Sequence, residues 1–130
     1  MRILLCIVAL LGISLPAVAH EMTPTYPTFS PSYVNGLAST KMSVFNARDD
    51  VDFYEVAVYN PVWEPVPFAA TDKILHVPFA EKKSFDVYVR DEDIARAVYI
   101  CTLSKLRSDK PSNAIISSKI CSRTDRAEFR

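Results

Sequence analysis

Apolar and polar residues alternate in block after block along the chain, with a period of two residues. Because successive side chains of a strand point to opposite faces, each block predicts a strand with one buried face. The buried faces are expected at Ala38, Thr40, Met42 and Val44, at Tyr54, Val56 and Val58, and at Phe85, Val87 and Val89. No segment of useful length has the period of a helix, so we predict an all-β domain.

The alternating blocks predict about seven strands. They are expected at residues 22–33, 38–46, 52–60, 74–79, 84–90, 97–106 and 113–122. The first block, MTPTYPTFSPSY, is rich in proline, which cannot donate to a ladder, so it is read as an irregular edge strand. Tyr99, two residues before Cys101, has the spacing of a tyrosine corner, or is an ordinary half-buried tyrosine. The pattern is typical of an immunoglobulin-like β-sandwich of about seven antiparallel strands.

The start of the chain has the form of a signal peptide. Arg2 precedes an apolar stretch from Ile3 to Leu15, and Ala17-Val18-Ala19 has the small-x-small pattern of a cleavage site. A membrane-spanning helix needs about 20 apolar residues, and Pro16 ends this stretch earlier. We therefore predict export to the periplasm or the cell exterior, without membrane insertion after cleavage.

These boundaries divide the chain into a signal peptide at 1–19, one sandwich domain at 20–123 and a polar tail at 124–130. Removal of residues 1–19 leaves 14 basic and 15 acidic residues. Nucleic acids and anionic lipids are bound by a concentrated excess of Lys and Arg. We therefore predict neither as a partner.

Cys101 and Cys121 are the cysteines that remain after cleavage, since Cys6 lies within the apolar stretch. An even count in an exported domain favours a disulfide over a metal site or a reactive thiol. In a hairpin centred on Pro111 the two residues would face each other, with Cβ atoms about 4.5–5.5 Å apart, near the separation that a disulfide requires. We predict a structural Cys101–Cys121 disulfide.

His20 would be the first residue of the cleaved chain, so its amino group and imidazole could together bind copper. His76 is the only other histidine and could complete a histidine brace. In the alternative interpretation His76 points to the surface, because Leu75, Val77 and Phe79 form the core face, and the domain carries no cofactor. We favour the second interpretation and keep copper binding as an alternative.

Catalysis by a nucleophile would require Ser or Cys together with His and an orienting acid. Neither histidine lies in a recognisable catalytic motif, and the domain has too little glycine for a phosphate-binding loop. We therefore expect that the protein is not an enzyme.

Several blocks together resemble the amino-terminal domain of the PapD-like periplasmic chaperones, which assemble pilus subunits. They are Met22-Thr23-Pro24, Val44-Phe45-Asn46, Glu55 to Tyr59, Pro67-Phe68 and the acidic corner before Val98-Tyr99. The resemblance implies an immunoglobulin-type fold and a protein partner. The chain is also similar to small uncharacterised exported proteins of marine tailed phages.

The chain departs from the chaperone pattern in two ways. PapD-like chaperones have a second domain, and they hold the subunit's terminal carboxylate with an arginine on the first strand and a lysine on the seventh. Here no basic residue precedes Lys41 in the predicted domain, and only Lys119 could stand near the second position. The resemblance then implies an edge strand offered to a partner, where backbone hydrogen bonds give affinity and side chains give selectivity.

The segment from Tyr59 to Phe68, YNPVWEPVPF, is the best candidate for partner contact. Prolines such as Pro65 stiffen it, which lowers the entropy lost on binding. Trp63 and Phe68 are residue types that anchor interfaces, although Trp63 could instead fold inward and cap one end of the sandwich. We predict Trp63, Pro65, Phe68 and Lys119 as partner-binding residues.

The sequence thus predicts an exported, non-enzymatic, immunoglobulin-like binding or assembly module that acts through edge-strand or loop contacts with a protein partner. Two alternatives stay open. One is a copper-binding protein with an amino-terminal histidine brace. The other is a structural component of a virion or cell-surface appendage, which would self-associate.

Overall fold

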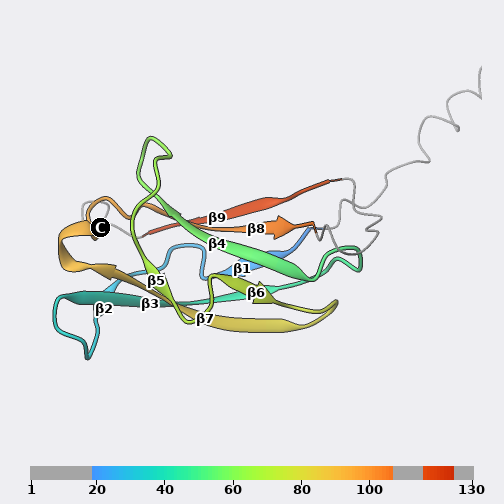
Figure 1. The fold of residues 1–130 in the computed structure, drawn as a ribbon, viewed down its shortest axis with the longest axis horizontal. Helices are drawn as coiled ribbons and strands as arrows, with labels where there is room; N and C mark the ends of the chain where they lie inside the picture. Colours follow the sequence, from blue (N-terminus) through green and yellow to red (C-terminus); the bar gives the residue numbers. More distant parts are fainter. Residues whose placement is uncertain (1–18, 107–115, 125–130) are drawn as a thin grey trace, which may run out of the picture.

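The computed structural model describes residues 19–106 and 116–124, which form two antiparallel sheets packed face to face (Figure 1). The first sheet has the order β1-β3-β7-β5, with β2 also paired to β3, and the second has the order β6-β4-β8-β9. The elements are β1 (Glu21–Thr23), β2 (Ser30–Pro31), β3 (Leu37–Phe45), β4 (Phe53–Tyr59), β5 (Ala69–Ala70), β6 (Ile74–His76), β7 (Lys82–Arg90), the 3-10 helix η1 (Asp91–Asp93), β8 (Tyr99–Lys105) and β9 (Lys119–Arg123). The predicted immunoglobulin-like sandwich is confirmed.

The core lies between the sheets and is built from the alternating faces of the long strands. β3 and β7 pair along their whole length, from Leu37 opposite Arg90 to Phe45 opposite Lys82. Every residue that the alternation predicts to face inward on β3, β4 and β7 is buried. The period of two therefore identifies the core correctly, because in a sandwich each sheet turns one face inward.

Two of the predicted edge segments differ from the structure in length. The proline-rich block 22–33 forms two short strands, β1 and β2, that pair with opposite ends of β3. The block 74–79 forms a strand only as far as His76. Leu75 and Val77 are buried as predicted, but Phe79 is exposed, because it lies beyond the end of the strand. Before it, the two-residue strand β5 pairs with β7, so the chain crosses from the first sheet to the second between Ala70 and Ile74. Two residues are too few to show alternation, so the sequence pattern does not reveal β5.

The acidic corner after β7 is held by ion pairs. Asp93 is buried at the end of η1, and its carboxylate accepts hydrogen bonds from the guanidinium groups of Arg96 and Arg90. These contacts, with the Arg96 hydrogen bond foremost, lower the pKa of Asp93. The corner therefore enters β8 as a fixed turn, with the carboxylate ionised at neutral pH.

A buried asparagine joins the turn after β3 to the neighbouring strands. The Asn46 side-chain amide donates to the carbonyl oxygens of Val51 and Val77 at 2.6 and 2.8 Å. Its Oδ1 accepts from the backbone N–H of Arg48 at 2.8 Å and from the Tyr54 hydroxyl. This network fixes Arg48 and Tyr54, which both lie beside His20.

The predicted domain boundaries fall partly outside the described residues. This applies to the signal peptide up to residue 18, the hairpin turn at Pro111 and the tail from residue 125. Thr124, predicted as the first tail residue, still packs on the domain, and its hydroxyl donates to the Ala97 carbonyl oxygen at 2.9 Å. In the described part of the chain, no helix has the length and apolar character needed to cross a membrane.

Candidate functional site

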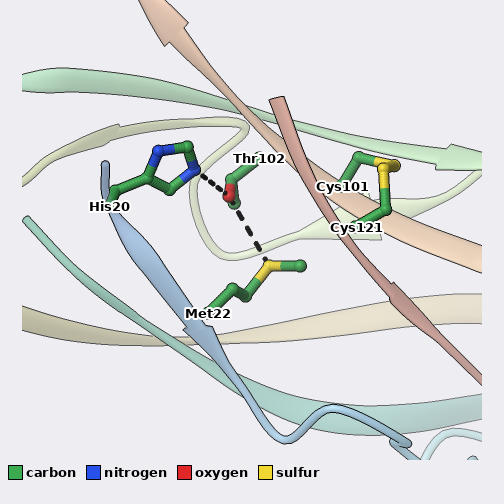
Figure 2. The surroundings of a disulfide bond; sticks show 5 residues. All are labelled: His20, Met22, Cys101, Thr102 and Cys121. Atoms are coloured by element: carbon green, nitrogen blue, oxygen red, sulfur yellow. Dashed lines mark hydrogen bonds between the residues drawn. A yellow bond between two sulfur atoms is a disulfide. The ribbon is translucent and has the colours of Figure 1, made fainter. Parts of the chain in front are cut away.

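The ring of His20 is enclosed between the sheets at the start of β1. The residue is only 1 % exposed. Figure 2 shows its Nε2 directed at the Thr102 hydroxyl of β8, at 2.8 Å, and Thr102 in turn directed at the sulfur of Met22, at 3.6 Å. The other ring nitrogen, Nδ1, lies 3.0 Å from the Ser118 hydroxyl. Both nitrogens that could bind a metal are therefore hydrogen-bonded to hydroxyl groups.

His76 lies on the other side of the second sheet. Its ring stacks on Phe53, with the centroids 4.8 Å apart, whereas the ring of His20 lies 4.5 Å from that of Tyr54. Phe53 and Tyr54 are consecutive residues of β4, so their side chains point to opposite faces. The hypothesis that His20 and His76 form a copper site together is therefore wrong in geometry, because a sheet separates them. Among the described residues, no group of three or more potential metal ligands gathers anywhere.

The cysteines meet as predicted. Cys101 of β8 and Cys121 of β9 are directly opposed in the register and form a disulfide, with Cα atoms 4.0 Å apart. Cys101 alternates with the core residues Ile100 and Thr102, so the bond lies on the outer face of the second sheet (Figure 2). The disulfide therefore ties the edge strand β9 to β8 next to the surface described below.

The loop after β4 is ordered by its own hydrogen bonds and stands out from the second sheet (Figure 1). The Asn60 side chain accepts from the backbone N–H groups of Val62 and Glu64, at 3.0 and 2.8 Å. The Asn60 main chain also bonds to Trp63 and Glu64. These contacts hold Trp63 at φ 65°, a conformation that few residues other than glycine adopt.

Trp63 is the centre of a surface cluster made of Tyr59, Trp63, Tyr99 and Lys119, hereafter the Trp63 cluster. The indole stacks on Tyr99, with centroids 4.2 Å apart and an interplanar angle of 5°. The Lys119 ammonium lies 4.3 Å from the centroid of Tyr59 and 4.8 Å from that of Trp63, within the range of cation–π attraction. Trp63 nevertheless stays 49 % exposed.

The structure thus brings together two of the four predicted partner-binding residues, Trp63 and Lys119. Pro65 is exposed and pairs with Tyr59 in an isolated bridge that closes the same loop. Phe68 is different, because it is partly buried against the core, and Lys73 covers its ring at 4.9 Å. The interpretation in which Trp63 folds inward is also wrong, since its ring packs on the outer face of the second sheet.

The sequence placed Tyr59 and Asn60 in the candidate segment without giving either a role, and it did not indicate Tyr99 as a member of this site. Tyr99 and Tyr59 are opposed in the register of β4 and β8, with both side chains on the outer face. The Tyr99 ring is engaged by Trp63, which fits the half-buried tyrosine of the second interpretation rather than a tyrosine corner. An asparagine before a proline is a common turn signal, and Asn60-Pro61 could have pointed to an ordered loop.

β9 is the last strand of its sheet and lies beside the cluster. The amide of Ser104 donates to the carbonyl of Ser118, and that of Thr124 to Val98, so the even-numbered residues here bond to β8. The odd-numbered residues direct their backbone groups away from β8, and the Arg123 amide accordingly donates to the Thr25 carbonyl oxygen at 3.2 Å. In the described part of the chain no strand pairs with this side of β9 at Lys119 and Cys121.

The comparisons with known proteins concern the fold. No protein-family model and no curated protein sequence matches the chain. Among solved structures, the E. coli chaperone DraB superimposes with a TM-score of 0.62 at 17% identity, over 82% of this chain and 53% of that one. A structure of the Salmonella enterica SafA pilin in complex with the SafB chaperone matches with a TM-score of 0.62 at 12% identity, over 85% and 55%. The chain therefore has the fold of a PapD-like chaperone domain and spans about half the length of these chains.

Proposed function

We propose that this domain is an exported, non-enzymatic, immunoglobulin-like binding or assembly module, which takes a protein partner along the open edge of β9 and the adjoining Trp63 cluster. The observation that carries the proposal is the fixed but exposed position of Trp63, stacked on Tyr99 beside an unpaired strand edge. A large aromatic side chain that is already ordered loses little entropy on binding, and tryptophan is a frequent interface anchor.

The open edge supplies the second part of the contact. The backbone groups of Lys119 and Cys121 point away from β8, and β1 contacts this side of β9 without pairing to it. An extended segment of a partner that moves β1 aside can therefore add to the sheet through main-chain hydrogen bonds. The structural neighbours support this use of the fold, because both are described as chaperones and one as a complex with a pilin. They also support a periplasmic setting and a role without catalysis.

The charges on β9 favour a different protein over a second copy as the partner. If two β9 strands paired antiparallel about Cys121, Lys119 of each copy would lie opposite Arg123 of the other. Like charges placed directly opposite destabilise a strand pair. The edge is therefore protected against self-pairing, and the alternative of a self-associating structural component has less support.

The test is a comparison of variants in capture from the exported proteins of the native source. We expect the intact protein to enrich one partner that is lost with Trp63→Ala and with Lys119→Glu. Val62→Ala is the matched control, because Val62 lies in the same loop and is 67 % exposed but has no place in the cluster. The purified partner should then bind the wild type and the control with equal affinity in calorimetry. The proposal would be contradicted if both variants captured the partner as well as the wild type does, or if the protein bound only to itself.

A further inference from the structure

The edges of the two sheets meet along a seam formed by β1 and β9. At one end of the seam the Arg123 amide donates to the Thr25 carbonyl oxygen. At the other end His20, the residue before β1, reaches Thr102 of β8 and Ser118, the residue before β9. The histidine side chain therefore fastens the start of the first sheet to two strands of the second.

The hydrogen-bond network assigns one proton to this ring. Thr102 donates its hydroxyl proton to the Met22 sulfur, so its oxygen accepts from Nε2–H of His20. Nδ1 is then unprotonated and accepts from the Ser118 hydroxyl, whose oxygen also accepts from the guanidinium of Arg48 at 3.4 Å. Neutral His20 satisfies every group in this set.

A second proton on the ring breaks this arrangement. Protonated Nδ1 is a donor, so the Ser118 hydroxyl must turn away, and its oxygen then faces two cations, His20 and Arg48. Among the described residues no carboxylate contacts the ring. Asp50 is engaged by Arg48 at 2.7 Å, and Tyr54 is neutral because burial raises its pKa to about 12. In the cleaved chain the α-ammonium group of His20 is a further cation next to the ring, and it opposes a second proton in the same way as Arg48.

We propose that His20 is a proton-sensitive latch: the neutral ring holds β1 against β8 and β9, and proton uptake at Nδ1 opens the seam. Opening frees the Arg123 amide from Thr25 and so lengthens the unpaired edge of β9. This device goes beyond the proposed function, since it operates in the domain alone and can be tested without a partner.

The electrostatics agree with the geometry. Burial is the main cause that lowers the pKa of His20; a hydrogen bond to Thr102 raises it in part, and the positive charge of Arg48, the smallest of the three effects, lowers it again. The closed state therefore binds the proton less readily than the open state, in which the ring has a pKa near 6.5. Between pH 7.5 and 5.5 the opening equilibrium should rise by up to about tenfold.

The experiment follows amide hydrogen exchange at Arg123 and Met22 at both pH values, corrected for the intrinsic effect of pH on exchange. We expect the protection of these amides in the wild type to fall by up to about tenfold from pH 7.5 to pH 5.5. His20→Gln, which keeps a donor and an acceptor but does not titrate, should show no pH dependence. His76→Gln is the matched control and should behave like the wild type. The same loss in His20→Gln, or none in the wild type, would overturn the latch.

A second measurement keeps the test valid if His20→Gln does not fold. The His76→Gln variant contains a single histidine, so its ring signals in NMR spectra report on His20 directly. The ring should take up its proton below pH 6.5, and protection of the Arg123 amide should fall over the same pH range. Proton uptake without loss of protection would show that the ring is no latch.

Discussion

The indole of Trp63 lies parallel to the ring of Tyr99, 4.2 Å away, although 36 positions separate the two residues in the chain. The stack fixes the side chain of a loop residue whose backbone is already held by the hydrogen bonds of Asn60. It also places the exposed side of the indole next to Lys119 and the open edge of β9. The surface proposed for partner binding is therefore formed before any partner arrives.

Removal of the stack should change both stability and fluorescence. Tyr99→Leu loses an aromatic pair worth about 1 kcal/mol, so the free energy of unfolding should fall by that amount. Trp63 is the only tryptophan, and its emission should shift as its surroundings become wetter. Denaturant titration followed by fluorescence measures both effects. Tyr33→Leu, at a residue that is 94 % exposed, is the control, and an unchanged emission spectrum in Tyr99→Leu would argue against an ordered Trp63.

Loss of the disulfide should destabilise the domain substantially. The bond between Cys101 and Cys121 spans 20 positions, and closing a loop of that size reduces the entropy of the unfolded chain by an amount worth about 3 kcal/mol. The Cys101→Ala/Cys121→Ala double variant should therefore unfold at a lower urea concentration than the oxidised wild type. Equal midpoints for the two proteins would show that the bond adds nothing to stability.

Substitutions of Tyr54 and Asn46 should lower the free energy of unfolding by very different amounts. Tyr54→Phe removes one donor and leaves the Asn46 oxygen with the Arg48 amide, so a cost of about 1 kcal/mol is expected. Asn46→Ala leaves the buried carbonyls of Val51 and Val77 without their donor, and it should cost at least about 3 kcal/mol. Urea denaturation of both variants decides the point, and equal losses would contradict the assigned network.

The acidic corner should make the domain sensitive to strong acid. Because Arg96 and Arg90 lower the pKa of Asp93, the stability it contributes is present above the ordinary pKa of about 3.9 and is lost as pH falls through the lower, folded-state value. Asp93→Asn should be less stable at neutral pH and should depend less on pH below about 4. Thermal unfolding from pH 2 to 7 tests this, with the exposed Asp49→Asn as control. If the stability of Asp93→Asn still falls steeply in acid, groups other than Asp93 cause the acid sensitivity.

Binding of Cu²⁺ should not require His20 and His76 together. Since His20 and His76 lie on opposite faces of the second sheet, we expect His76→Gln to bind Cu²⁺ as the wild type does. Calorimetric titration of both proteins provides the measurement. A tight one-to-one site that disappears with His76→Gln would require the two residues to meet after a rearrangement.

The sequence was informative wherever the physics is local and periodic. Alternation of apolar and polar residues identified the inward positions of β3, β4 and β7, because the strand period of two fixes which side chains share a face. The same regularity placed Cys101 opposite Cys121, since paired residues of an antiparallel hairpin keep a constant index sum.

The contacts of the candidate site were harder to foresee because they join distant segments. Nothing near Trp63 in the sequence indicates a positive φ or a stack on Tyr99, so the loop could as well have folded inward. His20 stands outside any alternating block, and its partners Thr102 and Ser118 are 82 and 98 positions away. Phe68 was predicted as an interface anchor because it is aromatic, but its side chain packs against the core instead.

The proposed partner-binding surface is tested most directly by amide hydrogen exchange of β9, measured in the free domain and in the complex with the partner whose capture requires Trp63. The Lys119 and Cys121 amides face the open edge, so they should exchange readily in the free domain and slow strongly on binding. Slowing at these amides together with a change in Trp63 fluorescence is the predicted result. Protection of another surface, with Lys119 and Cys121 unchanged, would contradict the proposal that this edge and its aromatic cluster receive the partner.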